Sequence, residues 1–142
     1  MEKYNNFCKA LANLHEGVKL SEPYTVVEQT GIVALFEICF EQSWKLMKAV
    51  LETHGRFEQK IGSPRAIIKI AFQCNMISNE ILWLDLLNAR NIVSHTYSDE
   101  QSLLVIKELK EKYIVVFDEL KKELEARWLV EEAVSSNAES SN

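Results

Sequence analysis

The chain has 142 residues, of which 47% are hydrophobic and 26% charged, and its formal net charge is -5. This length allows one domain with a sizeable core, and the composition is typical of a soluble globular protein. The negative charge excludes a general nucleic-acid binder, so DNA is not expected as a ligand and any RNA contact must be local. No apolar run is long enough to span a bilayer, so no membrane partner is expected.

The first half of the chain predicts two helices. Apolar residues at steps of three and four place the first helix over residues 4–20, with its end near residue 17 or 20. The second begins after a capping box formed by Thr25 and Glu28 and continues to His54. At about thirty residues, this second helix is the longest expected in the chain.

Two shorter helices follow a polar connection. Ser63 is the expected N-cap of the third helix, with a proline at its first position, and this helix covers residues 65–74. Either Ser78 or Asn79 caps the fourth helix, which runs to about Val93.

A fifth helix completes the predicted fold. Ser98 and Gln101 cap it, and its apolar residues keep helical spacing as far as Trp128. We therefore expect an all-α, antiparallel helical bundle of about five helices, forming a single domain over residues 1–132. Residues 133–142 are small and polar and are expected to be a disordered tail.

Residues 90–97, ArgAsnIleValSerHisThrTyr, gather several chemically active groups near the end of the fourth helix. Arg90 offers a planar fork of donors for a phosphate, His95 can exchange protons near neutral pH, and Asn91 can orient either one. Arg90 and His95 lie about 140° apart on a helix, so they converge poorly within one chain. A homodimer, in which each chain contributes its set, is therefore expected.

These groups suit RNA cleavage without a metal ion. An imidazole would remove the proton of a ribose 2'-hydroxyl, and arginine would stabilise the charge on the phosphoryl oxygens. The alternative is structural, because Arg90 and His95 near a helix C-terminus also complement the helix dipole. Tyr97 taken alone would be a packing aromatic with its hydroxyl in water.

Three acidic residues are candidates for supporting this site. Glu37 and Glu41 lie on one stripe of the second helix and either form a solvated face or orient His95 or Arg90. Asp85 could bind Arg90 of a neighbouring helix, polarise the imidazole or face water. These positions build no metal site. The three cysteines are far apart, which is typical of a reducing cytoplasm.

The wider sequence resembles a known family. The spacing of Arg90, His95 and Tyr97 is similar to the signature of the HEPN superfamily. The blocks LeuPheGluIleCysPheGluGlnSerTrpLys (35–45), GlySerProArg (62–65) and TrpLeuAspLeuLeuAsnAlaArgAsnIleValSerHisThrTyr (83–97) resemble its nucleotidyltransferase substrate-binding proteins. The resemblance covers about residues 3–125.

The resemblance implies a HEPN-like, four-helix up-and-down core in a small cytoplasmic protein. Such proteins dimerise and bind a separately encoded minimal nucleotidyltransferase, often as a toxin and antitoxin pair. It also implies that the matching Arg90 and His95 can form a ribonuclease that needs no metal or other cofactor, and that the partner can adenylylate Tyr97. The chain lacks the GlySer motif with paired aspartates of the transferase, so it is not expected to transfer nucleotides itself.

Two functions therefore remain open. In the first, the chain is a ribonuclease subunit with Arg90 and His95 from two chains in its site. In the second, it is a non-catalytic subunit that binds a nucleotide, RNA or another substrate around the same residues. The motif favours the first function, and the acidic charge of the chain favours the second.

Overall fold

In the computed structural model, residues 1–57, 62–95 and 98–129 are described, and within these ranges the chain contains helices and no strand. The elements are α1 (Glu2–Val18), α2 (Val26–Thr53), α3 (Pro64–Gln73), α4 (Glu80–His95), α5 (Asp99–Glu108), the π-helical segment η1 (Leu109–Tyr113), α6 (Ile114–Glu123) and the π-helical segment η2 (Leu124–Trp128). The all-α prediction is confirmed. The tail predicted for residues 133–142 lies outside the described residues.

Polar side chains begin four of these helices as predicted. Thr25 and Glu28 bond to each other's backbone amide at the start of α2, at 3.1 Å and 2.8 Å. The Ser63 side chain accepts a hydrogen bond from the Ala66 amide at the start of α3. The Ser98 side chain accepts one from the Gln101 amide at the start of α5. Of the two candidates before α4, Asn79 is the residue whose side chain accepts such a bond. Each bond satisfies an amide that the helix itself leaves unpaired.

Two helices end beside a residue type that commonly ends helices, whereas α4 is longer than predicted. Gly55 after α2 and Asn75 after α3 both have φ near +60°, at 65° and 62°. Glycine and asparagine tolerate this left-handed conformation best, which is why they end helices. Neither glycine nor asparagine directly follows Val93, and α4 continues to His95.

The predicted fifth helix is divided by two π-helical segments. Its buried side chains include pairs four residues apart, Leu109 with Tyr113 and Leu124 with Trp128. A step of four overshoots the 3.6 residues of an α-helical turn, so a repeated step of four drifts around the helix. The wider π turn falls at both of these steps and keeps the apolar stripe facing the core.

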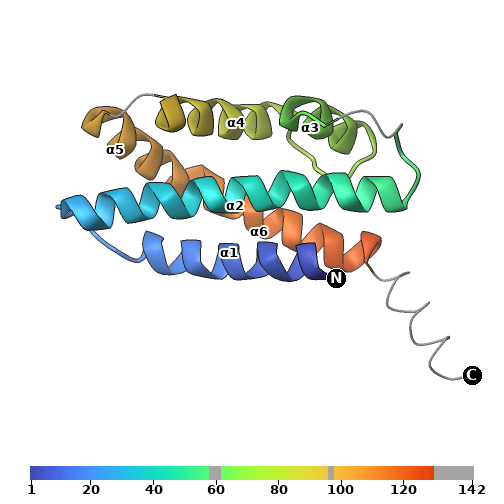
Figure 1. Cartoon of the computed structure of the whole chain (residues 1–142), viewed down its shortest axis with the longest axis horizontal. Helices are drawn as coiled ribbons and strands as arrows, with labels where there is room; N and C mark the ends of the chain where they lie inside the picture. The colour runs from blue at the N-terminus through green and yellow to red at the C-terminus, as the bar shows by residue number, and fades with distance from the viewer. Residues whose placement is uncertain (58–61, 96–97, 130–142) are drawn as a thin grey trace, which may run out of the picture.

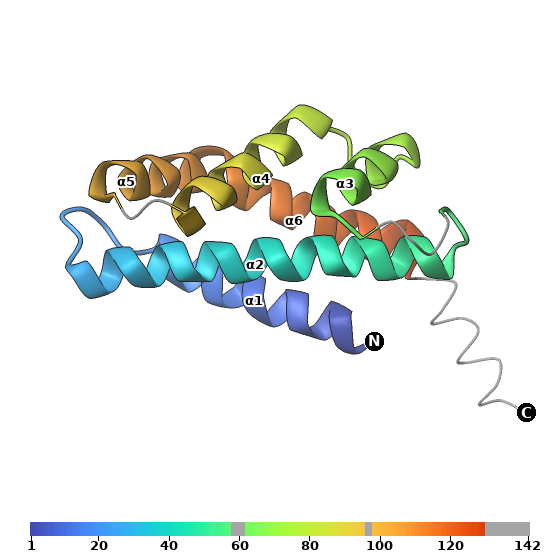
Figure 2. The same cartoon turned by 45° about the horizontal axis from the view of Figure 1, so that its top comes forward.

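Helix α2 lies at the centre of the bundle. It contacts α1 on one side and α3, α4 and α5 on the other, while α6 contacts α1. Successive long elements alternate in direction, and α2 lies between α1 and the α3–α4 layer in both views (Figures 1 and 2). This is the up-and-down arrangement implied by the resemblance.

An aromatic cluster joins the layers in the core. The Phe36 ring stacks on Tyr113 with 5.9 Å between centroids and contacts Phe117 at 6.5 Å. Trp83 of α4 meets Phe117 edge to face at 5.8 Å and Phe40 at 6.5 Å. These contacts hold α2, α4 and α6 in a fixed relation, which places the end of α4 against α2.

Within the described residues, no helix is both long and apolar enough to cross a membrane.

Candidate functional site

The end of α4 packs against the first half of α2 in antiparallel fashion. Arg90 Nη2 lies 3.1 Å from Glu41 Oε2, and Ser94 Oγ donates a hydrogen bond of 3.0 Å to Glu37 Oε2. Residues four apart on one helix lie on one face. The two contacts therefore form a short ladder between α4 and α2, and they bring two of the predicted acids beside the motif.

Arg90 is held on two sides. Its guanidinium carbon lies 5.7 Å from the centroid of the Phe40 ring, within the range of a cation–π contact, and its side chain is 25% exposed. The Glu41 carboxylate holds the other side. Arg90 is thus oriented toward α2, with one of its five donors engaged by Glu41 and the fork still able to bind a further anion.

Glu41 connects Arg90 to two other residues of α2. Trp44 Nε1 donates a hydrogen bond of 3.0 Å to Oε2, and Lys45 Nζ lies 3.4 Å from Oε1. Partial burial acts to raise the pKa of Glu41, but the hydrogen bonds from Trp44 and Lys45, with the charges of Lys45 and Arg90, outweigh burial and leave the pKa below its usual value. Glu41 is therefore an anion at neutral pH and a positioning partner for Arg90.

Replacing Glu41 with glutamine should lower stability only where the carboxylate is charged. A depressed pKa contributes stability above the ordinary value of 4.5, and this contribution disappears as the pH falls through the lower folded-state pKa. The side chain is 36% exposed, so solvent screening limits the effect to under about 1 kcal/mol. Urea unfolding of both proteins between pH 3 and pH 7 measures the difference. A difference that does not shrink at acid pH would contradict this role of the charge.

His95 and Asn91 lie on a different stripe of α4 from Arg90. His95 is the last residue of α4 and is exposed, while Asn91 is partly buried. Within the described residues, His95 forms no hydrogen bond with Glu37 or Glu41. Tyr97, the predicted modification site, lies outside those residues.

The charge of Asp85 acts on Lys112 and Tyr113 of η1. The pKa of Lys112 is raised mainly by its hydrogen bond to Glu108, and the charge of Asp85 adds to this shift. Burial raises the pKa of Tyr113, with Glu108 and Asp85 again contributing. Asp85 is exposed, and no ion pair with Arg90 is recorded within the described ranges. Within one chain Asp85 is therefore not a partner of Arg90, and a contact with Arg90 or His95 of a second chain stays a prediction.

Ser94 and Phe40 also contact the site, although neither is among the site residues predicted from the sequence. Ser94 follows Arg90 by four residues, and Glu37 precedes Glu41 by four. Matching steps of four on two antiparallel helices are a signal that could have paired Ser94 with Glu37. Phe40 gave no such signal, because an aromatic residue in an apolar stripe is usually part of the core.

Comparisons with known proteins identify the family and support the fold. The family described as nucleotidyltransferase substrate binding protein like matches residues 2–126. A protein of Haemophilus influenzae named probable ribonuclease HepT is 30% identical over 86 residues, which are 57% of this chain and 59% of that protein. The chain thus spans less than two thirds of the length of this curated relative.

A solved structure extends the likeness to the fold. The crystal structure of a protein from Thermus thermophilus is similar with a TM-score of 0.74 at 27% identity, and the match covers 83% of this chain and 98% of that one. The range matched by the family includes the blocks at residues 35–45, 62–65 and 83–97 on which the resemblance rests. The chain therefore belongs to the nucleotidyltransferase substrate binding protein family, within the HEPN superfamily.

Proposed function

We propose that the protein is a dimeric partner subunit of a separately encoded minimal nucleotidyltransferase, in a module of the toxin and antitoxin kind, and that it works in the cytoplasm. Its ligand is a nucleotide, another transferase substrate or RNA, bound in a groove that two chains form around Arg90 and His95. The family description supports the transferase partner. The proposed residues are Arg90 and His95, supported by Asn91, Glu37 and Glu41.

The divergence of Arg90 and His95 is the observation that carries this proposal. Arg90 turns toward Glu41 on α2, and His95 is exposed at the end of α4. Five residues along a helix turn a side chain by about 140°, so one chain presents the two groups on separate faces. A second chain, related by twofold symmetry, can supply the complementary group and complete the site.

The chemistry of these groups fits a phosphate ligand. The Arg90 fork can bind two phosphate oxygens, and its contacts with Glu41 and Phe40 reduce the freedom it loses on binding. Asn91 supplies an amide that can orient the ligand. His95 is accessible to solvent and can donate to a phosphoryl oxygen when protonated.

The second candidate function is a metal-independent ribonuclease, and the name of the Haemophilus relative favours it. One His95 would take the 2'-hydroxyl proton, and the 2'-oxygen would attack the adjacent phosphorus. The bond to the 5'-oxygen would break, and the second chain's protonated His95 would donate a proton to that oxygen. Adenylylation of Tyr97 would silence this activity. The net charge of -5 favours the binding subunit instead, because a ribonuclease that cuts many RNAs would gain from a positive charge that attracts them.

Incubation with RNA in the presence of a chelator separates the two candidates. Cleavage by the wild type that falls about 10²- to 10⁴-fold in His95→Ala indicates the ribonuclease. Unchanged RNA, together with nucleotide or RNA binding that weakens in His95→Ala, indicates the binding subunit. His15→Ala is the matched control, because His15 lies on α1 and pairs with Asp118 of α6. If the wild type neither cleaved RNA nor bound RNA or nucleotide, both candidates would be contradicted.

Two measurements test the assembly. Light scattering should report a mass about twice the 16.4 kDa of the chain. A small nucleotidyltransferase encoded beside this gene should co-purify with the protein when both are expressed together. A monomer at micromolar concentration would contradict the composite site, and failure to co-purify would contradict the partner.

A further inference from the structure

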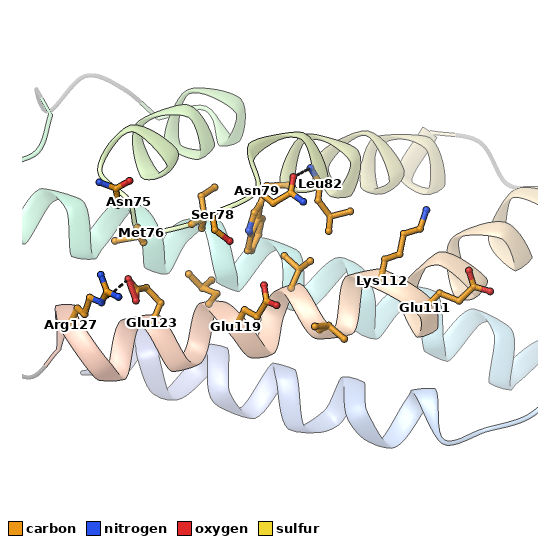
Figure 3. A pocket seen from close by; sticks show the side chains of 15 residues that line it. Asn75, Met76, Ser78, Asn79, Leu82, Glu111, Lys112, Glu119, Glu123 and Arg127 are labelled. Atoms are coloured by element: carbon orange, nitrogen blue, oxygen red, sulfur yellow. Dashed lines mark hydrogen bonds and ion pairs between the residues drawn. The ribbon is translucent and has the colours of Figure 1, made fainter.

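A groove on another part of the molecule lies away from Arg90 and His95. It runs between the helix formed by η1, α6 and η2 and the segment from Asn75 into the first turn of α4, and its volume is about 710 Å³. We name it the α4–α6 groove. Its lining comes from residues 75–83 and 111–127, so it includes none of residues 90–95. Figure 3 shows it extending from Asn75 and Arg127 at one end to Glu111 and Lys112 at the other.

The α4–α6 groove is elongated. One row of its lining residues on the long helix recurs at every fourth position: Glu111, Val115, Glu119, Glu123 and Arg127. The sixteen steps from Glu111 to Arg127 rise about 24 Å, which equals four to five helical turns. A groove of this length, open along one side, fits a helical segment better than a compact small molecule.

The floor of the groove is apolar. Val115 is 51% exposed on the long helix, and Leu82 is partly exposed on α4. Trp83, Met76 and Leu120 lie beneath them and are buried. The groove therefore offers a strip of apolar surface between two polar edges, as grooves that bind an amphipathic helix do.

The edge on the long helix is acidic. Its two cations are already paired, since Lys112 Nζ lies 2.9 Å from Glu108 and Arg127 Nε lies 3.4 Å from Glu123. Glu111 and Glu119 are exposed, and no ion pair is recorded for either within the described parts of the chain. Figure 3 shows the Glu119 carboxylate beside the middle of the groove. The uncompensated charge at this edge is negative.

We infer that the α4–α6 groove docks a basic amphipathic helix of another protein. Apolar residues of that helix contact Val115 and Leu82, and its lysines or arginines face Glu111 and Glu119. The chain's own end is not the occupant, because residues 128–142 contain three glutamates and no lysine or arginine. RNA is excluded as the occupant by the same acidic edge. This inference does not depend on Arg90 or His95.

A designed peptide tests the inference on the full-length protein. The probe is a twelve-residue helix with leucines on one face and lysines elsewhere, titrated into ¹⁵N-labelled protein. Amide shifts should change at Leu82, Val115 and Glu119. Glu119→Lys should weaken binding about tenfold, because it places like charges opposite one another. Glu22→Lys makes the same charge change at an exposed loop position outside the groove and should leave binding nearly unchanged.

Two further peptides define the outcomes. Binding should be lost when the leucines are replaced with serine, and also when the lysines are replaced with glutamate. Equal binding of the serine peptide would overturn the inference, because the edge would then bind any polycation. Equal weakening by Glu22→Lys and Glu119→Lys, or shift changes confined to other surfaces, would overturn it as well. Glu119 is exposed, so the variant should fold, and its thermal unfolding is checked first.

Discussion

Replacing Arg90 with alanine should weaken phosphate-ligand binding, or RNA cleavage if the protein cleaves, by about 10²- to 10³-fold. The guanidinium is the one permanent cation in the Arg90 to His95 segment, and Glu41 and Phe40 hold it in place. Arg90→Lys keeps the charge but loses the planar fork, so it should recover only a small part of the loss. Titration of RNA and of nucleotide into both variants measures the effect.

Arg65→Ala is the matched control for this prediction. Arg65 is an exposed arginine at the start of α3, and it lies outside residues 90–97. Its removal changes the net charge of the chain equally. An equal loss in both variants would show that overall charge, rather than the site at the end of α4, determines binding. Glu41→Gln keeps Arg90 but loosens its positioning, so binding should weaken less than in Arg90→Ala.

Replacing Phe36 with alanine should lower the free energy of unfolding by about 3–5 kcal/mol. Phe36 is 0% exposed and contacts the Tyr113 and Phe117 rings at 5.9 Å and 6.5 Å. Alanine would leave a cavity between α2 and the helix of η1 and α6. Because the core is close-packed, its neighbours can fill only part of that space. Urea unfolding at pH 7 measures the loss as a lower midpoint with an unchanged slope.

Phe72→Ala is the control for burial. Phe72 lies on α3 and is 41% exposed, so its removal should cost under about 1 kcal/mol. A similar loss in both variants would contradict the central position of Phe36 in the core. Since α2 also carries Glu41, loosening of the core at Phe36 should reduce ligand binding in proportion to the unfolded fraction.

Local signals in the sequence predicted the helices because they act over three or four residues. Thr25, Ser63 and Ser98 each satisfy an amide three positions away, and Gly55 tolerates a left-handed backbone. Such contacts depend little on the rest of the molecule. The two π-helical segments were missed, because they arise from the need to keep a drifting apolar stripe against a core that the sequence does not display.

The sequence by itself determined the all-α class, the start of each helix after the first and the position of Arg90 to His95 at the end of a helix. It also showed that Arg90 and His95 diverge, since that angle follows from helical geometry alone. Only the tertiary structure decided that Glu41 pairs with Arg90, that Glu37 receives Ser94, and that Asp85 lies near Lys112. The reason is physical: the Arg90–Glu41 and Ser94–Glu37 pairs join residues 49 and 57 positions apart, and their meeting depends on how the aromatic core sets the register of α4 against α2.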